Sequence, residues 1–366
     1  MKPEQGKISS SQLMFLIAGL IQGSSLLVAF ATKITKQNTW LVVLLGFAIS
    51  LGLALIYVTL AQNFPEKNLI EINEIVYGKY LGNLISGLYI WFFFSIGSFN
   101  LRFVGDFSLT YLVPETPIIV ILVMFAFICI WAVRSGIEVI GRLSGIFVII
   151  TLIEVITTSL LLIKQMKLTN FLPLFDLSLQ DFIHGTHTMT SIPFGEIMIF
   201  LMIIPSVNKL NQVKSATLSG LCIGGFTVLF STLRNTAVLG ITATIMFSPS
   251  FEAVRLIDIA GVITRMEVLV ASVLLITLFI KTSLLLYVTV LALAQLFRLR
   301  TYRPLVLPVC ILMISFALLA FDSTMENALS AANDWPIVSI PFNFLFPLAS
   351  LILIKIRRLH QGGGGK

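Results

Sequence analysis

The sequence predicts an all-α polytopic membrane protein with ten transmembrane helices, the first and the sixth of which are broken. Of the 366 residues, 57% are hydrophobic and only 11% are charged, and the mean hydropathy is +1.00. The apolar residues fall into runs of roughly 20, the length that crosses the hydrocarbon core of a bilayer. These observations argue against a soluble domain and indicate that lipid surrounds the chain.

The apolar runs place the ten spans along the chain. They lie at 11–33, 39–62, 81–105, 116–134, 139–163, 182–206, 215–243, 266–297, 302–321 and 335–356. We expect residues 1–361 to form a single integral membrane domain, because no polar stretch between the spans is long enough to fold separately. Residues 362–366 are expected to be a flexible tail, since a run of glycines offers no side chains for packing.

The basic residues predict how the chain is oriented in the membrane. The loops on the side of the termini hold fifteen of them: Lys2, Lys7, Lys67, Lys79, Arg134, Arg142, Lys209, Lys214, Arg298, Arg300, Arg303, Lys355, Arg357, Arg358 and Lys366. The opposite side holds six: Lys33, Lys36, Lys164, Lys167, Arg255 and Arg265. The positive-inside rule then places both termini in the cytoplasm. The net charge of +7 is explained by topology, so no nucleic-acid partner is expected.

A short polar and aromatic segment interrupts the sixth span at 191–196, with the sequence Ser-Ile-Pro-Phe-Gly-Glu. Pro193 lacks a backbone donor, Gly195 relaxes the backbone and Glu196 adds a carboxylate at membrane depth. Backbone groups freed in lipid must be satisfied by protein or by a water-lined cavity. Secondary transporters build ligand sites from unwound helices of this kind. The alternative is a simple proline kink with a snorkelling or paired glutamate.

The first span carries a second interruption at Gly23, Ser24 and Ser25. Small residues serve either close helix packing or helix unwinding. Spans one and six are five helices apart, so the two breaks would be equivalent in two five-helix repeats of inverted topology. The inferred repeats cover about 11–163 and 182–321, with helices nine and ten completing the bundle. The paired breaks predict a ligand site near the bilayer midplane.

Two pairs of charges within the spans are interpreted as structural. Arg102 and Asp106 are four residues apart on span three, a spacing that allows an ion pair on one helix face. Arg234 lies within span seven, and Glu267 at the start of span eight is its expected partner.

Lys281 near the middle of span eight needs a counter-charge, because a lone ammonium at that depth is costly. Glu154 in span five and Glu196 in span six are the available carboxylates. A lysine–carboxylate pair beside two broken helices would be an electrostatic lock that a proton or a zwitterionic ligand could bias. The alternative is a permanently closed structural bridge.

Two connections are expected to form surface helices. Residues 66–79 have the apolar spacing of an interfacial amphipathic helix. Residues 248–261 begin with Ser248 and Pro249, a plausible helix start. That second helix could cover an extracellular vestibule as a lid, or could simply rest on the bundle.

No catalytic, metal or cofactor site is predicted. Cys129, Cys222 and Cys310 are scattered through the spans without metal-ligand or disulfide spacing. His184 and His187 are interpreted as interfacial polar residues, since no third metal ligand is nearby. No nucleophile, base and orienting group converge, so an enzyme is not expected.

Five markers in order carry a resemblance to a known family. They are Ile8-Ser9 with Gln12, Gly23-Ser24-Ser25, Ser98-Phe99 with Arg102, Pro193-Phe194-Gly195-Glu196, and Lys281 with Ser283 and Tyr287. Over nearly its whole length the chain resembles the B subunit of GerA-type spore germinant receptors, within the amino acid–polyamine–organocation superfamily. Phe30 departs from the pattern, because many members carry proline there.

The resemblance implies a LeuT-like fold and a nutrient sensor in the spore inner membrane that works with an A subunit and a lipoprotein C subunit. The nutrient is expected to be an amino acid, with a sugar or nucleoside as alternatives. By position, the ligand pocket of the family maps onto Gly23, Ser24, Ile96, Pro193, Phe194 and Lys281. Ser25, Phe92 and Gly195 are added as neighbours that supply a hydroxyl, an apolar wall and backbone freedom.

The resemblance also bears on ion coupling. Sodium-coupled relatives hold a sodium ion between spans one and eight, and Lys281 falls close to that place. We therefore expect its ammonium group to stand in for the cation. A proton-coupled amino acid transporter, driven through Glu196 or Glu154, is the competing function. Both functions use the same pocket, so the sequence does not separate them.

Overall fold

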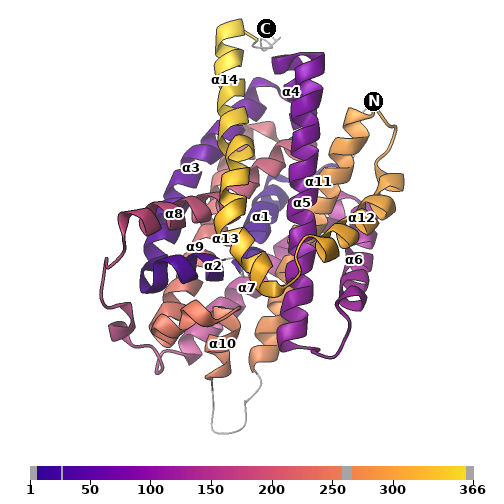
Figure 1. Cartoon of the computed structure of the whole chain (residues 1–366). Coiled ribbons are helices and arrows are strands. Elements are labelled where there is room, and N and C mark those ends of the chain that lie inside the picture. The colour runs from indigo at the N-terminus through magenta and orange to yellow at the C-terminus, as the bar shows by residue number, and fades with distance from the viewer. Residues whose placement is uncertain (1–5, 26–27, 258–265, 360–366) are drawn as a thin grey trace.

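The computed structural model describes residues 6–25, 28–257 and 266–359, and these form a bundle of helices that run between two ends (Figure 1). Within these residues, seven helical segments are each long and apolar enough to cross a membrane. Two shorter apolar segments, Ser10–Gln22 and Arg303–Leu319, belong to the first and ninth spans. The sixth span is assembled from several short helical pieces, none of which is long enough to cross a membrane alone.

The ten spans follow the predicted order. They are α1 (Ser10–Gln22) with α2 (Val28–Thr35), α3 (Thr39–Asn63), α5 (Lys79–Tyr111), α6 (Ile118–Ser135), α7 (Ile137–Leu161), α8 (Leu179–Met189) with η4 (Thr190–Phe194) and η5 (Gly195–Met202), α9 (Val213–Leu239), α11 (Met266–Leu296), α12 (Val306–Leu319), and α13 (Thr324–Ile340) with η10 (Pro341–Leu345) and α14 (Phe346–Arg357). The connections contain η2 (Lys36–Asn38), α4 (Leu69–Tyr77), η3 (Leu168–Phe171), η6 (Ile204–Ser206), η7 (Leu210–Gln212), η8 (Gly240–Ile245), α10 (Pro249–Arg255) and η9 (Arg303–Leu305).

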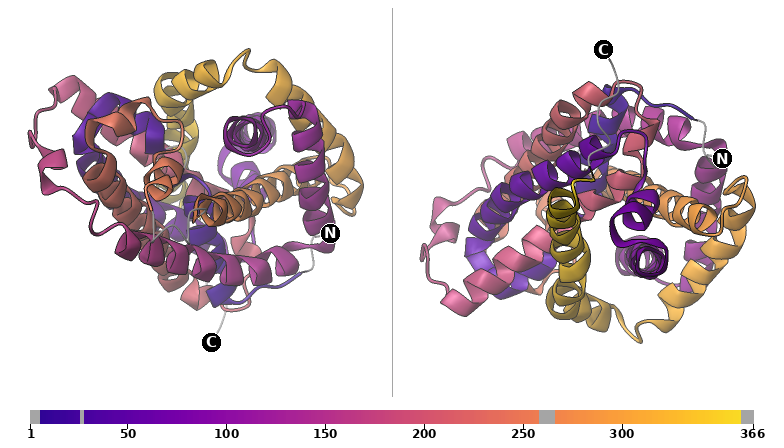
Figure 2. Two further views of the ribbon diagram at one scale, coloured as in Figure 1. Left: turned by 90° about the horizontal axis from the view of Figure 1, so that it is seen from below. Right: turned by 90° about the horizontal axis from the view of Figure 1, so that it is seen from above.

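The end of α14 lies at one end of the bundle and α10 lies at the opposite end (Figure 1). The backbone N–H of Lys7 donates to Glu138 at the start of α7 over 2.9 Å. The guanidinium of Arg357 at the end of α14 donates to the carbonyl of Val76 in α4 over 3.0 Å. Views along the bundle show α5 and α11 inside a ring formed by other helices (Figure 2).

Both breaks appear where the sequence predicts them. The first span stops at Gln22 and resumes at Val28. In the sixth span Ile192 has extended backbone angles (φ −133°, ψ 119°) directly before Pro193. The following η5 is a 3₁₀ helix, so the two halves of this span differ in winding as well as in direction.

The tenth span has a proline inside α13, and a neighbouring helix satisfies the carbonyl that it leaves without a partner. Pro336 lacks the N–H that would bond the carbonyl of Ala332, four residues earlier. On α8, Nε2 of His184 lies 3.1 Å from that carbonyl oxygen and the hydroxyl of Thr188 donates to it over 3.3 Å. The first half of span six is therefore held against span ten.

A second irregularity in span ten, the π-turn η10, is held by tyrosines. The hydroxyl of Tyr57 on α3 donates to the carbonyl of Asn343 over 2.7 Å, and that of Tyr89 on α5 donates to Phe342 over 3.1 Å. These are the polar partners that irregular backbone requires inside a membrane. Span ten thus keeps a bent shape that curves around the centre of the bundle.

The structure corrects the predicted start of span ten. It also describes both predicted surface helices, the second of them in part. The tenth span begins at Thr324 rather than at 335, because Ser323 caps a helix whose first half is rich in polar residues. The interfacial helix predicted over 66–79 is α4. The helix predicted over 248–261 is α10, which ends at Arg255, while 258–261 and the tail at 362–366 fall outside the described residues.

We predict that Gly220→Ala destabilises the protein. Gly220 on α9 touches α1, and an added Cβ would lie 2.5 Å from the backbone oxygen of Met14, which cannot turn aside. Overpacking of this kind costs about 1–3 kcal/mol. Gly52→Ala is the matched control, because nothing lies within 4 Å of its Cβ position. Thermal denaturation of the purified protein should show a lower midpoint for Gly220→Ala alone. Equal midpoints for the two variants would contradict the packing described.

Candidate ligand-binding site

Three side chains from the two breaks and from α11 meet in the centre of the bundle. Nζ of Lys281 lies 2.7 Å from Oε2 of Glu196 and donates to Oγ of Ser24 over 2.6 Å. The Ser24 hydroxyl in turn lies 3.4 Å from the same carboxylate. The side chains of Lys281 and Glu196 are only 1% and 2% exposed. Spans one, six and eight are thus joined through one buried ion pair.

Gly23 makes this meeting possible. A Cβ at Gly23 would lie 2.7 Å from the backbone oxygen of Thr277 and 2.8 Å from Cβ of Lys281. Only a residue without a side chain lets the end of α1 approach α11 this closely. The approach places Ser24, the next residue, against the ammonium group. Gly23 therefore allows α1 and α11 to pack closely enough for Ser24 to reach Lys281.

Gly195 has a similar role at the sixth span. An added Cβ would overlap the side-chain amide of Asn343 from span ten. The space left by the glycine admits that amide, whose Nδ2 lies 3.5 Å from the carbonyl of Ser191 in the break. A backbone acceptor freed by the irregular winding thereby gains a donor. Gly195 and Asn343 together couple the sixth span to the tenth.

A closed pocket lies beside the ion pair. It is lined by Ile96, Phe99, Asn100, Phe103, Ile192, Glu196, Lys281, Phe321, Asn327, Ser330, Ala331 and Trp335. The space available inside measures about 20 Å³, enough for one water molecule, since a water needs roughly 10–15 Å³ by this measure. One end of the pocket is ionic and the rest is mostly aromatic or aliphatic. A larger guest requires the pocket to widen.

The structure brings some of the predicted site residues together. Ser24, Glu196 and Lys281 form the ionic end, and Ile96 lines the pocket wall. Glu154, the other candidate partner of Lys281, does not take part. Its carboxylate instead lies 3.3 Å from the hydroxyl of Thr158 on the same helix.

Other predicted pocket residues lie behind the wall or face elsewhere. Phe92 stacks on Trp335 with ring centroids 5.3 Å apart, so it supports the pocket without lining it. Phe194 packs on Phe47 of α3 at 5.7 Å, and neither it nor Pro193 lines this pocket. Ser25 lines a different hollow on the other side of α1.

One of the two predicted structural ion pairs forms. Nε of Arg102 lies 3.0 Å from Oδ1 of Asp106. The carboxylate of Asp106 also accepts hydrogen bonds from Thr324 at 2.9 Å and Asn327 at 3.1 Å. This cluster fastens α5 to the start of α13, directly beside the pocket.

The predicted ion pair of Arg234 with Glu267 is wrong. Among the described residues Arg234 has no carboxylate within ion-pair distance; its guanidinium donates to Thr158 at 2.6 Å and to Asn235 at 3.1 and 3.2 Å. Sequence proximity to the start of α11 suggested Glu267, but the side chain turns toward α7 instead.

Sequence reasoning missed the contribution of span ten to the pocket. Asn327, Ser330, Ala331 and Trp335 all lie on α13, upstream of the predicted start of that span or at its first residue. The available signal was the polar run before Trp335, which is unusual for a lipid-facing helix and indicates a helix packed partly against protein.

Solved structures with the same arrangement are membrane transporters. A nucleobase–cation–symport-1 family transporter, Mhp1, in a closed conformation with bromovinylhydantoin bound, matches with a TM-score of 0.71 at 13% identity, over 98% of this chain and 80% of that one. MhsT in complex with L-phenylalanine matches with a TM-score of 0.62 at 14% identity, over 96% and 99%. The fold is therefore the LeuT fold, with helices one and six broken, as predicted.

The sequence comparisons define the family. The model of the family described as spore germination protein matches residues 7–325. Spore germination protein KB of Bacillus subtilis (strain 168) is 30% identical over 368 residues, 99% of this chain and 98% of the relative. Spore germination protein B2 of the same organism is 23% identical over 72% of each chain. The chain belongs to the spore germination protein family, which confirms the resemblance drawn from its motifs.

We predict strong energetic coupling between Lys281 and Glu196. Either Lys281→Met or Glu196→Gln alone leaves a buried charge without its partner, which costs about 3–5 kcal/mol. The double variant removes both charges and should recover most of that loss. Thermal denaturation of the four proteins in detergent gives the coupling. The exposed pair of Glu252 and Arg255 on α10, 3.2 Å apart, is the control and should show at most about 1 kcal/mol. Additive losses at Lys281 and Glu196 would contradict the ion pair.

Proposed function

We propose that this chain is the nutrient-binding membrane subunit of a spore germinant receptor. The observation that carries the proposal is the buried Lys281–Glu196 pair, which forms the ionic end of a closed pocket beside the break in span six and is joined to the break in span one through Ser24. Family membership supports a role in germination, and the fold is one in which other proteins hold small molecules, L-phenylalanine in one case. The nutrient is a small zwitterion with an apolar body, and a neutral amino acid fits best.

The chemistry of recognition follows from the charges of the pair. The carboxylate of an amino acid matches the ammonium of Lys281, and its amino group matches the carboxylate of Glu196. The ligand therefore replaces one ion pair by two, so that neither protein charge is left alone in a low-dielectric site. Phe99, Phe103 and Trp335 provide the apolar surface for the side chain of the ligand.

Binding must change the shape of the bundle, because the closed pocket holds about one water molecule. Widening it moves α13 away from α5 and strains the hydrogen bond that Asn327 donates to Asp106. A ligand shifts such an equilibrium only by the difference in its affinity for the two states, typically about 1–3 kcal/mol for coupled sites. Partner subunits, an A subunit and a lipoprotein C subunit, read this change.

The proposed setting is the spore inner membrane, with the whole chain acting as one membrane domain and both termini in the cytoplasm. The excess of basic residues at the end of the bundle where α1 starts and α14 finishes supports this orientation.

Lys281 also takes the place of a coupling cation. Its ammonium group lies between the break of span one and α11, bound to Ser24 at 2.6 Å. A second positive charge there would be repelled. We predict that nutrient affinity is unchanged when sodium is replaced by choline in the binding buffer. A loss of binding without sodium would contradict this assignment.

We predict that Trp335→Ala weakens nutrient binding by at least about tenfold, because a buried aromatic wall supplies much of the contact area. The ligand is first found by a thermal-shift screen of neutral amino acids, sugars and nucleosides on the detergent-solubilised protein. Its dissociation constant is then measured for wild type, Trp335→Ala and Trp131→Ala. Trp131 is 64% exposed on α6 and serves as the control.

Two outcomes would count against the proposal. Equal affinities for all three proteins would remove the pocket from nutrient binding; should Trp335→Ala fail to fold, Ser330→Ala in the same wall provides the comparison. Substrate-dependent flux in reconstituted vesicles would instead favour the alternative, a proton-coupled amino acid transporter. The receptor proposal expects binding without flux.

A further inference from the structure

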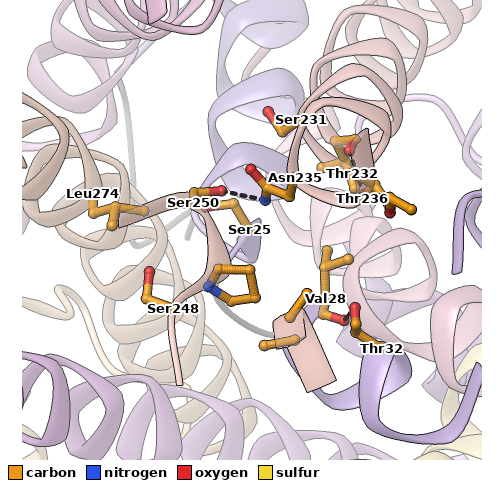
Figure 3. A pocket seen from close by; sticks show the side chains of 14 residues that line it. Ser25, Val28, Thr32, Ser231, Thr232, Asn235, Thr236, Ser248, Ser250 and Leu274 are labelled. Atoms are coloured by element: carbon orange, nitrogen blue, oxygen red, sulfur yellow. Dashed lines mark hydrogen bonds between the residues drawn. The ribbon is translucent and has the colours of Figure 1, made fainter. Parts of the chain in front are cut away.

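A second polar hollow lies on the other side of α1, in the half of the bundle that carries α10. Its deeper part is lined by Gln22, Glu154, Arg234 and Thr277. Its outer part, next to α10, is rich in hydroxyl and amide groups (Figure 3). The two parts adjoin each other, because both are lined by Ser25, Val228, Ser231, Ser250 and Leu274. We call the whole hollow the α10 chamber. None of its lining residues lines the pocket at Lys281.

Opposite charges lie across the deeper part of the α10 chamber without forming an ion pair. Glu154 on α7 and Arg234 on α9 both line it, and no salt bridge joins them within the described part of the chain. The carboxylate has the hydroxyl of Thr158 as a partner, and the guanidinium donates to Thr158 and Asn235, which are neutral. The hydroxyl of Thr158 thus bridges the two charges, accepting from Arg234 and donating to Glu154. The bridge holds the guanidinium, 3% exposed, and the carboxylate on facing walls without direct contact, so that a dipolar guest can bind both.

Two further polar atoms in the α10 chamber are unpartnered. Oε1 of Gln22 is buried and has no hydrogen-bond partner among the described residues, although its Nε2 donates to Thr227 over 3.2 Å. Oγ of Ser248, beneath α10, is likewise unpartnered. Both residues are 1% exposed. Buried polar atoms normally have a partner, so these two point to a polar guest.

We infer that the α10 chamber is a second ligand site, which takes a small zwitterion of the size of glycine. The carboxylate of the guest faces Arg234, and its ammonium faces Glu154 and the free oxygen of Gln22. A simple cation would be opposed by Arg234 and a simple anion by Glu154, whereas a dipolar molecule satisfies both. The spaces of about 30 and 20 Å³ hold about three waters between them, so a guest of five heavy atoms enters only by displacing these waters and widening the chamber.

The site is connected to α10 by hydrogen bonds. Asn235, which holds the guanidinium of Arg234, donates from Nδ2 to the hydroxyl of Ser250 on α10 over 2.9 Å (Figure 3). A guest that binds Arg234 therefore changes the hydrogen bonds of Asn235, and through them the position of α10 over the chamber. This inference is independent of nutrient binding at Lys281, because the two sites share no lining residue.

The test measures occupancy of the α10 chamber by protection from modification. Ser231→Cys places a thiol in the chamber, and its reaction with a small methanethiosulfonate reagent is timed with and without millimolar glycine. The background carries Lys281→Met and Glu196→Gln, which disables the other pocket, and the same background without the new cysteine corrects for the native thiols. Glycine should slow the reaction about fivefold or more, and adding Arg234→Gln should abolish the protection.

The controls separate the two sites. Ser330→Cys, in the pocket at Lys281, should show no glycine protection in this background. Where Arg234→Gln does not fold, Glu154→Gln provides the same comparison from the opposite wall. The inference is overturned if glycine fails to protect Ser231→Cys, or if protection survives loss of either charge. The chamber would then hold water only.

Discussion

The ion pair between Lys281 and Glu196 is the interaction on which the centre of this molecule depends. It joins α11 to the break in span six and, through Ser24, to the break in span one. Inside a bilayer neither charge can be released to water, so each stays with the other until a group of equal charge replaces it. This constraint turns two broken helices into a single unit, and we propose that a zwitterionic nutrient opens it.

Span ten supplies one wall around that centre. Its proline kink and its π-turn leave carbonyls free, and side chains of α3, α5 and α8 bind them. The same span carries Trp335 and Asn327 into the pocket. Because its irregular backbone is satisfied by side chains of other helices, a rearrangement of span ten is transmitted to spans two, three and six. A local event at the ion pair can thereby reach the surface of the bundle.

The helix order and both breaks were predictable, because Pro193, Gly195 and the glycine–serine cluster at 23–25 have few other uses in lipid-length apolar runs. The need of Lys281 for a carboxylate was also predictable from depth alone. The choice of Glu196 over Glu154 was not, since it depends on how each helix is rotated about its axis. Rotation likewise turned Phe92 and Ser25 away from the pocket and Arg234 away from Glu267. The first half of span ten was missed because its polar residues lower the apolar content of the segment. Asn327 faces protein, whereas Glu326, Asn333 and Asp334 are exposed.

The most direct test of the account is a structure of the nutrient complex. The distance between Nζ of Lys281 and Oε2 of Glu196, 2.7 Å in the closed pocket, is the quantity to measure. The account predicts that the two side chains separate and that the carboxylate and amino group of the ligand lie between them. A bound nutrient with the Lys281–Glu196 pair still intact would contradict it.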